Sequence, residues 1–353
     1  MKKLALGLLL TLPTVNAAAS QVETAPPDQN AAAADETATV DEEEEIDDEG
    51  RIVGGEDAPP NSAPWQIEIY STVASYTAKE IADDANPQIT PPEKRKYLNL
   101  RKGFELAHKC GGSYIGDGWI LTAAHCVTGL GMVDGKPVDV FTHRRVRMGT
   151  QNLAAGGATF AIAQVITHAG YTEEVPKDDI ALIKVADNGQ LIKLLASGAL
   201  APITMQANVP NAPPIRNEPL RVSGWGWQGA RKKSTMARVD IGGRPQRNPA
   251  QLKQATVFKT DESKCAAIAE YKGIASAKTM CVALGPKNAD SCQGDSGGPL
   301  TRALPNGDRV LVGIVSQGVG CANPGYPGLY TRVSAYQSWI KSAKASRKRF
   351  SKQ

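Results

Sequence analysis

The sequence predicts a mainly β domain of antiparallel strands that begins near Ile52. Short segments rich in β-branched residues recur along the chain, and Gly, Pro and Asn separate them. The 353 residues are 41% hydrophobic and 22% charged, a composition that fits a globular protein of one large or two small domains. These observations exclude a wholly disordered or fibrous protein.

Residues 1–19 have the three parts of a secretory signal peptide. Lys2 and Lys3 precede an apolar run from Leu4 to Leu12, and small residues follow at Ala17 to Ser20. The run is much shorter than the roughly 18 residues that a membrane-spanning helix needs. We therefore expect export, to the extracellular space or the periplasm, and no membrane span.

Residues 20–51 read as an acidic, disordered propeptide. Residues 20–50 hold 12 Asp and Glu and no Lys or Arg, so they cannot build a core. From Ile52 onward, 37 Lys and Arg face 24 Asp and Glu, about +13, although the whole chain has a net charge of only +4. The body that follows the leader is strongly basic.

The β-branched segments and one late helix are the elements we expect. The helix starts at about Ser334 as its N-cap and continues through Trp339 and Ile340 toward Ala345. The expected strands are Gln66–Tyr70, Thr159–Thr167, Asp179–Val185, Leu220–Ser223, Gln254–Lys259 and Arg309–Ser316.

Six cysteines in an exported chain indicate up to three disulfides, but six cysteines allow 15 complete pairings and their spacing does not choose among them. A zinc site would recruit Cys110, His125 and Cys126. The chain has no CxxC pair, so we expect no metal site there and no cofactor.

The segment from Gly294 to Pro299, Gly-Asp-Ser-Gly-Gly-Pro, is the most informative motif. Its glycines permit a tight turn that exposes the Ser296 hydroxyl and points successive backbone N–H groups inward, where they can hold an oxyanion. A serine in a glycine-rich turn can equally be a turn residue only.

A nucleophilic serine needs a base, and the base needs a partner that orients it. His125 lies among small residues beside Cys126, and Asp179 enters an apolar segment that would bury its carboxylate. Taken singly, each has an ordinary alternative, His125 as a core histidine and Asp179 as a turn residue at a strand entry.

Taken together, these segments resemble the trypsin-like serine proteases. Ile52-Val53-Gly54-Gly55, the Thr-Ala-Ala-His-Cys segment ending at Cys126, the Asp-Ile-Ala-Leu-Ile-Lys-Val segment from Asp179, Gly224-Trp225-Gly226 and the Ser296 turn occur in the family's order. The resemblance covers roughly residues 52–342. It implies an all-β fold of the chymotrypsin type, with two packed six-stranded antiparallel barrels, at about 65–185 and 218–335, and a C-terminal helix. Residues 343–353, which lie beyond the resemblance, are a basic tail.

The resemblance also implies roles for residues. Ser296 is the expected nucleophile, His125 the base and Asp179 its buried partner, with the Gly294 and Ser296 amides as the oxyanion hole. Asp178 directly precedes Asp179, and we choose Asp179 because the family's aspartate immediately precedes the Ile-x-Leu strand. The implied disulfides are Cys110–Cys126, Cys265–Cys281 and Cys292–Cys321.

Asp290 occupies the position at which such enzymes carry the carboxylate of the S1 pocket, and Ser316, Gly318 and Gly328 match the pocket walls. A buried carboxylate pairs with a guanidinium or an ammonium, which predicts cleavage after Arg or Lys in protein or peptide substrates. A solvated loop aspartate is the alternative. Gln317 replaces the family's usual Trp and leaves the preference at P2–P4 open.

Arg51-Ile52 resembles a zymogen activation bond, whose cleavage would free the Ile52 ammonium to pair with Asp295. An activating protease or the enzyme itself could cut it, and protein inhibitors are further expected partners. The segment between Ile52 and Cys110 is longer than in a typical trypsin and contains Lys94, Arg95, Lys96, Arg101 and Lys102. Such insertions either border the cleft or are simply surface loops.

Two further predictions concern ligands. The loop from Gly149 to Leu153 has no carboxylate, so we expect no calcium site there. The alternative to an enzyme is a basic binding protein on a protease fold that grips acidic surfaces or polyanions; no motif indicates specific nucleic-acid binding. The residues that such a basic binding protein would use are Arg144, Arg145, Arg147, Arg231, Lys232, Lys233, Arg347, Lys348 and Arg349.

Overall fold

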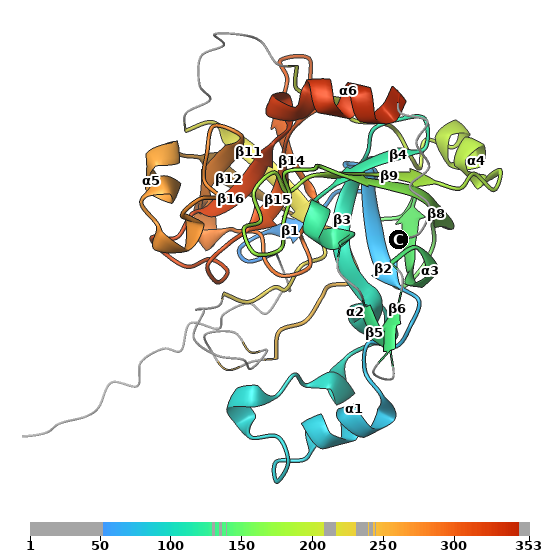
Figure 1. Ribbon diagram of the computed structural model, residues 1–353, viewed down its shortest axis with the longest axis vertical. Coiled ribbons are helices and arrows are strands. Elements are labelled where there is room, and N and C mark those ends of the chain that lie inside the picture. The colour runs from blue at the N-terminus through green and yellow to red at the C-terminus, as the bar shows by residue number, and fades with distance from the viewer. Residues whose placement is uncertain are drawn as a thin grey trace, which may run out of the picture. The chain divides into compact units, whose positions relative to one another are not determined.

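The structure is a computed structural model that describes residues 52–128, 131–133, 136–138, 140–207, 217–230, 239, 243 and 245–345. The predicted signal peptide, the acidic propeptide and residues 346–353 of the basic tail lie outside the described residues. Figure 1 shows the strands gathered into two groups that lie next to each other. In the described part of the chain, no helix is both long and apolar enough to cross a membrane.

Six antiparallel strands close the first barrel in the order β2-β3-β4-β9-β8-β7. The inward face is apolar because side chains alternate along a strand, as in β8, where Ala158, Phe160 and Ile162 are buried and their neighbours exposed. The strands are β2 (Gln66–Ser71), β3 (His108–Tyr114), β4 (Trp119–Thr122), β7 (Arg144–Met148), β8 (Ala158–Thr167) and β9 (Ala181–Val185).

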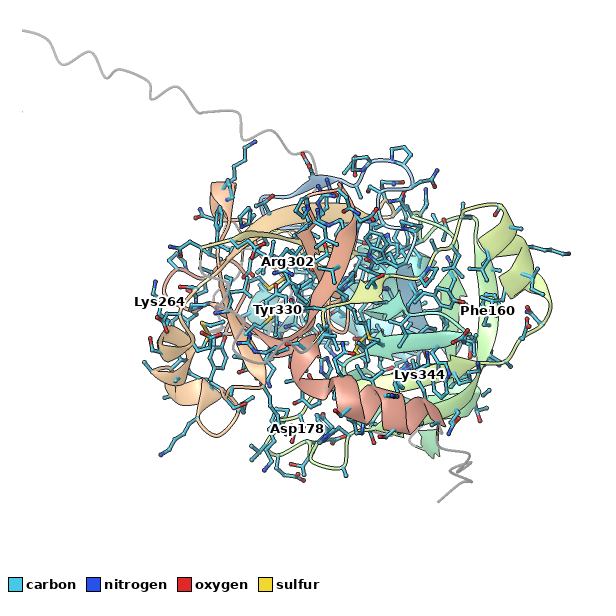
Figure 2. The ribbon with its side chains drawn as sticks, turned by 90° about the horizontal axis from the view of Figure 1, so that it is seen from above. Phe160, Asp178, Lys264, Arg302, Tyr330 and Lys344 are labelled. Carbon is cyan, nitrogen blue, oxygen red and sulfur yellow. A yellow bond between two sulfur atoms is a disulfide. The ribbon has the colours of Figure 1, made fainter. Side chains whose placement is uncertain are left out.

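The second barrel is also a closed antiparallel ring, in the order β11-β12-β13-β16-β15-β14. Its core holds Val222, Val257, Leu300 and Tyr330, and Figure 2 labels Tyr330. The strands are β11 (Pro219–Gly224), β12 (Lys253–Lys259), β13 (Thr279–Ala283), β14 (Pro299–Ala303), β15 (Arg309–Gln317) and β16 (Gly328–Arg332).

Smaller elements surround the barrels. Strand β1 pairs with β12, β10 pairs in parallel with β15, and β5 pairs with β6. These strands are β1 (Glu56–Asp57), β5 (Gly131–Val133), β6 (Lys136–Val138) and β10 (Thr204–Met205). The helices before the C-terminus are α1 (Ala78–Ala85), α2 (Gly103–Ala107), α3 (Val140–His143), α4 (Gln190–Ala196) and α5 (Glu262–Ala266), with 3₁₀ turns at Pro92–Lys94, Leu98–Leu100, Ala124–Cys126, Ala269–Tyr271 and Pro286–Asn288.

The C-terminal helix, α6 (Gln337–Ala345), joins the two barrels. It follows strand β16 of the second barrel, but its buried Ile340 belongs to the apolar core of the first barrel. The prediction that Ser334 is its N-cap is wrong. The buried Val333 already starts a 3₁₀ turn, Val333–Tyr336, and Arg332 precedes this turn.

The six described cysteines form three disulfides, Cys110–Cys126, Cys265–Cys281 and Cys292–Cys321, which are the pairs that the family resemblance implies. The sulfurs of Cys110 and Cys126 lie close to His125. Both sulfurs are already bonded to each other, so they cannot act as thiolate ligands for zinc.

Candidate active site

A cavity of about 370 Å³ contains residues of both barrels. His125 comes from the 3₁₀ turn after β4 in the first barrel, and Ser296 from the turn before β14 in the second. The cavity also has Tyr171, Glu173, Pro176, Asp290, Ser291, Cys292, Gln293, Val315, Ser316, Gln317, Gly318, Gly320 and Gly328 in its walls.

Asp179 holds both the backbone and the side chain of His125. The Asp179 carboxylate, which is 2% exposed, accepts hydrogen bonds from the His125 backbone N–H at 3.0 Å and from Nδ1 at 2.8 Å. The Nδ1 proton therefore faces Asp179, which leaves Nε2 as the available base. The Cys110–Cys126 disulfide anchors the neighbouring residue to strand β3.

Two hydroxyls of the second barrel hold Asp179, and sequence reasoning missed both contacts. Ser316 Oγ donates to Asp179 Oδ2 at 2.6 Å, and Thr331 Oγ1 donates to the Asp179 carbonyl at 2.8 Å. Burial alone would raise the pKa of Asp179, but the hydrogen bonds from His125 and Ser316 outweigh it and hold the pKa below its ordinary value.

Asp178 is turned away from His125. Its backbone has φ of 50°, and its carboxylate contacts Lys278 Nζ at 2.8 Å and accepts a hydrogen bond from the Tyr336 hydroxyl at 2.7 Å. Figure 2 labels Asp178. The left-handed conformation sends the two adjacent carboxylates to different partners, so only Asp179 reaches His125.

The turn that carries Ser296 requires its glycines. Gly297 has φ of +76°, and a Cβ there would overlap the Thr122 hydroxyl and the Gly111 carbonyl, so the turn packs tightly against the first barrel. Ser296 lines the cavity with His125, but no direct hydrogen bond joins Ser296 Oγ to His125 Nε2. Such bonds are often long in the absence of substrate.

The Gly294 and Ser296 amides are suited to an oxyanion hole. Within the described part of the chain, neither N–H donates to a protein acceptor. The Gly294 carbonyl accepts a hydrogen bond from His108 Nε2 at 2.9 Å. This contact fixes the peptide unit next to the Gly294 amide, and it too was missed from the sequence.

His108 and Glu68 form a second buried histidine–carboxylate couple. Their side chains are 1% and 2% exposed, and Nδ1 lies 3.3 Å from Glu68 Oε1. A carbonyl can only accept, so Nε2 donates to Gly294, and Nδ1 faces the Glu68 carboxyl group.

Asp290 lies at the buried end of the cavity. Its carboxylate accepts hydrogen bonds from the backbone N–H groups of Ser291 and Ala322, both at 2.8 Å. Burial raises its pKa to about 7, although these two N–H bonds act in the opposite direction. Gly318 and Gly328 lie in the cavity wall, where any side chain would take up volume.

Asp295 is fully buried beside the candidate nucleophile. It accepts hydrogen bonds from the backbone N–H groups of Gly226 at 2.7 Å and Cys292 at 2.8 Å, and burial raises its pKa to about 6. A Cβ at Gly224 or Gly226 would overlap its carboxylate, which explains why glycines flank Trp225. No described cation forms an ion pair with Asp295.

The side chain of Gln317 extends toward the first barrel. Its Nε2 donates to the Pro176 carbonyl at 3.2 Å, and both residues line the cavity. A polar contact therefore lies where the family usually has an aromatic side chain.

Comparisons with known proteins identify the family of the chain. The family model Trypsin matches residues 93–340. Trypsin beta of Drosophila erecta is 31% identical over 293 residues, which cover 83% of this chain and 88% of the relative. Trypsin Blo t 3 of Blomia tropicalis is 32% identical over 302 residues, with coverage of 83% and 86%.

Among solved structures, neuropsin, a serine protease expressed in the limbic system of mouse brain, superposes with a TM-score of 0.55. It is 26% identical, and the match covers 83% of this chain and all of neuropsin. The two barrels and the comparisons together define a chymotrypsin-fold serine protease. The chain belongs to the trypsin family.

Proposed function

We propose that the protein is an exported serine endopeptidase that cleaves after Arg or Lys. The contact that carries this proposal is the short hydrogen bond between Asp179 and His125 Nδ1, in a cavity that also contains Ser296 and ends at a buried carboxylate.

In the first step, the Ser296 oxygen attacks the scissile carbonyl while His125 Nε2 takes the hydroxyl proton. The carbonyl oxygen becomes an oxyanion, which the Gly294 and Ser296 amides stabilise. His125 then gives the proton to the leaving amine, and the carbon–nitrogen bond breaks to leave an acyl-enzyme. Asp179 stays ionised and balances the charge that His125 carries in between.

In the second step, water replaces the leaving amine. His125 takes a proton from the water as it attacks the acyl carbon, and returns that proton to Ser296 when the ester bond breaks. The oxyanion forms again at the same amides. The enzyme ends with Ser296 and His125 in their starting protonation states.

Specificity for Arg and Lys rests on Asp290. A carboxylate that is 7% exposed gains a partner when a guanidinium or an ammonium enters the cavity, whereas an apolar side chain would leave the charge unpaired. The glycines at 318 and 328 leave room for a long side chain.

Activation by cleavage at Arg51-Ile52 fits the position of Asp295. Its buried carboxylate receives backbone N–H groups but no described cation, and a freed Ile52 ammonium would supply one. The Ile52 side chain is already buried in the core of the second barrel. The signal peptide, the acidic leader and the three disulfides fit an exported zymogen.

Binding of acidic surfaces as the main function is less well supported. Arg147 Nε lies 3.5 Å from the buried Glu68, and the guanidinium covers the Tyr70 ring, so this candidate residue has internal partners. Residues 231–233 and 347–349 lie outside the described residues.

The test is hydrolysis of an Arg p-nitroanilide peptide by the chain cut at Arg51-Ile52. We expect turnover by the wild type and by Ser197→Ala, which removes an exposed hydroxyl, and a loss of at least 1,000-fold for Ser296→Ala. Equal turnover by Ser296→Ala would refute the proposal.

A further inference from the structure

The carboxylate of Asp178, the residue directly before Asp179, is held by segments that are distant in the sequence. Its side chain is 12% exposed, and Oδ1 accepts hydrogen bonds from the Tyr336 hydroxyl at 2.7 Å and from Lys278 Nζ at 2.8 Å. Lys278 precedes β13 of the second barrel, whereas Tyr336 ends the 3₁₀ turn before α6. Figure 2 shows Asp178 near the start of α6. Three separate parts of the chain therefore meet at this carboxylate.

His168 supports the tyrosine in this arrangement. Its ring centre lies 5.4 Å from that of Tyr336 and 5.4 Å from that of Trp339. Its Nδ1 accepts a hydrogen bond from the Gly170 backbone N–H at 3.0 Å, so this nitrogen is not a donor to Asp178, 3.8 Å away. Burial lowers the pKa of His168, which favours the neutral ring. The Tyr336 ring is thereby packed with its hydroxyl against Asp178.

The surroundings of Asp178 leave its carboxylate little room to move. A Cβ at Gly170 would lie 2.3 Å from Asp178 Oδ2, so the backbone there packs directly against the second carboxylate oxygen. Burial alone would raise the pKa of Asp178, but the hydrogen bonds from Lys278 and Tyr336 outweigh it and hold the pKa below its ordinary value. The carboxylate stays ionised, and hydrogen bonds to a charged oxygen are the stronger kind.

The backbone of Asp178 sets the position of Asp179. Asp178 lies in the left-handed region, with φ of 50°, and its carbonyl accepts a hydrogen bond from the Ile180 backbone N–H at 2.8 Å. This bond closes a three-residue turn with Asp179 in the middle. A change of φ at Asp178 would rotate the turn and move the Asp179 carboxylate relative to His125.

The left-handed backbone needs a contact that holds it, because a residue other than glycine lowers its free energy by returning to negative φ. The hydrogen bond from Tyr336, whose side chain is buried, supplies this contact. The ion pair with Lys278 contributes less, because the lysine side chain is 50% exposed and solvent screens its charge.

We propose that Asp178 is a positioning residue for catalysis. Its hydrogen bond from Tyr336 keeps the left-handed turn in place, and this turn directs the Asp179 carboxylate toward His125 Nδ1. This inference rests on the proposed protease function and names a further residue on which that function depends. Loss of the hydrogen bond slows the chemical steps and leaves binding at Asp290 unchanged.

The test is hydrolysis of an Arg p-nitroanilide peptide by the full chain cut at Arg51-Ile52 and by three variants of Asp178. Asp178→Ala and Asp178→Gly both remove the acceptor, but only alanine is strained at this φ. Asp178→Asn keeps an oxygen that accepts from Tyr336 and tolerates the left-handed region. We expect kcat to fall about tenfold in the Ala and Gly variants, with KM within about twofold, and to stay within about threefold of the wild type in Asp178→Asn.

Two measurements separate positioning from a general loss of structure. The inhibition constant of a small aromatic amidine, which reports on the Asp290 end of the cavity, should be the same in all three variants as in the wild type. The proton NMR signal of His125 Nδ1–H, which the short hydrogen bond to Asp179 shifts downfield, should move or broaden in Asp178→Ala and persist in Asp178→Asn.

Asp117→Ala is the matched control. Asp117 has φ of 53° and lies 3.5 Å from Lys344 Nζ, but its side chain is 83% exposed, and it lies between β3 and β4, outside the lining of the candidate active-site cavity. The substitution introduces the same kind of backbone strain at a distant position, so kcat should equal that of the wild type.

Tyr336→Phe tests the proposal from the donor side and decides the matter if Asp178→Ala does not fold. It removes the hydroxyl but keeps the ring against His168, so kcat should fall about fivefold with KM unchanged. Adding it to Asp178→Ala should lower kcat no further, because both changes remove the same hydrogen bond.

The results that overturn the proposal are distinguishable from failure of the protease function. A wild-type kcat in Asp178→Gly or Tyr336→Phe refutes the positioning role alone, and so does an equal fall of kcat in Asp117→Ala. A parallel loss of kcat and of amidine binding also refutes it, because Asp178 would then act only through the overall fold. A wild type that does not hydrolyse the anilide refutes the protease function, and the positioning role with it.

Discussion

Replacing Asp290 by Asn should stabilise the fold at pH 8 while it removes the partner of the substrate cation. In the folded protein the pKa of Asp290 is about 7, because burial disfavours the charged carboxylate, against an ordinary value of 3.8. Above both values this difference disfavours folding by about 4 kcal/mol.

The stability gained by the Asn substitution is smaller than this figure of about 4 kcal/mol, because Asn replaces one carboxylate oxygen with an NH₂ group. One of the two backbone N–H groups, of Ser291 or Ala322, then lacks its acceptor, which costs about 1–3 kcal/mol. We therefore expect Asp290→Asn to be more stable than its parent by about 2 kcal/mol at pH 8.

The sign depends on pH. A carboxyl with a raised folded pKa leaves the folded state binding more protons than the unfolded chain between about pH 4 and 7, so stability falls as pH rises through this window. At pH 4 the parent carboxyl is neutral in the folded state, and the advantage of Asn disappears. The variant should then be equal to its parent or less stable.

The assay is urea unfolding of the uncleaved chain at pH 4 and pH 8, in a Ser296→Ala background that prevents self-digestion. Glu93→Gln, which makes the same chemical change at an exposed side chain, is the control and should stay within about 0.5 kcal/mol of its parent. An Asp290→Asn protein that is less stable than its parent at both pH values would show that burial of the ionised Asp290 carboxylate does not destabilise the fold.

Three other predictions follow from the same contacts. In Ser296→Ala, the Kd of a small aromatic amidine should rise about tenfold for each pH unit below 7, because only the ionised Asp290 binds it, and a flat profile would contradict this. His108→Phe, which removes the hydrogen bond to the Gly294 carbonyl, should lower kcat about 5- to 150-fold while the amidine Kd stays constant; a change confined to the Kd would be inconsistent with this role. Asp295→Asn, or acetylation of the freed Ile52 amine, should abolish activity. An ion pair raises the pKa of the Ile52 amine above about 7.7–8.0, so the stabilisation by this pair is complete below that range and lost as pH rises through the folded pKa. Full activity of either protein would disprove the activation mechanism.

The sequence located the candidate residues that the structure brings together, but it did not reveal the contacts that position them. The turn around Ser296 and the segments around His125 and Asp179 are local motifs, so each could be found in a few consecutive residues. Ser316 and Asp179 are 137 residues apart, and Gln317 and Pro176 are 141 apart. Contacts of this kind depend on how the two barrels pack, which no local pattern encodes.

The segment at residues 72–107 also shows that local patterns do not reveal contacts between residues far apart in the sequence. Thr77 and Glu80 have the spacing of a capping box, a signal that could have located helix α1. The Glu105–Arg247 pair joins residues 142 positions apart, so the sequence alone left open whether this segment borders the cleft. At the C-terminus, Ser334 has a favourable cap chemistry, but burial of Val333 starts the turn earlier.

Hydrolysis of matched peptides with Arg, Lys or Phe before the scissile bond tests whether the protein is a serine protease specific for Arg and Lys. The proteins are the wild type and Ser296→Ala, each before and after cleavage at Arg51-Ile52. We predict activity in the cleaved wild type alone, confined to the Arg and Lys peptides. Cleavage after Phe would contradict the assignment of Asp290, and inactivity of all four proteins would contradict the assignment of the protein as a protease.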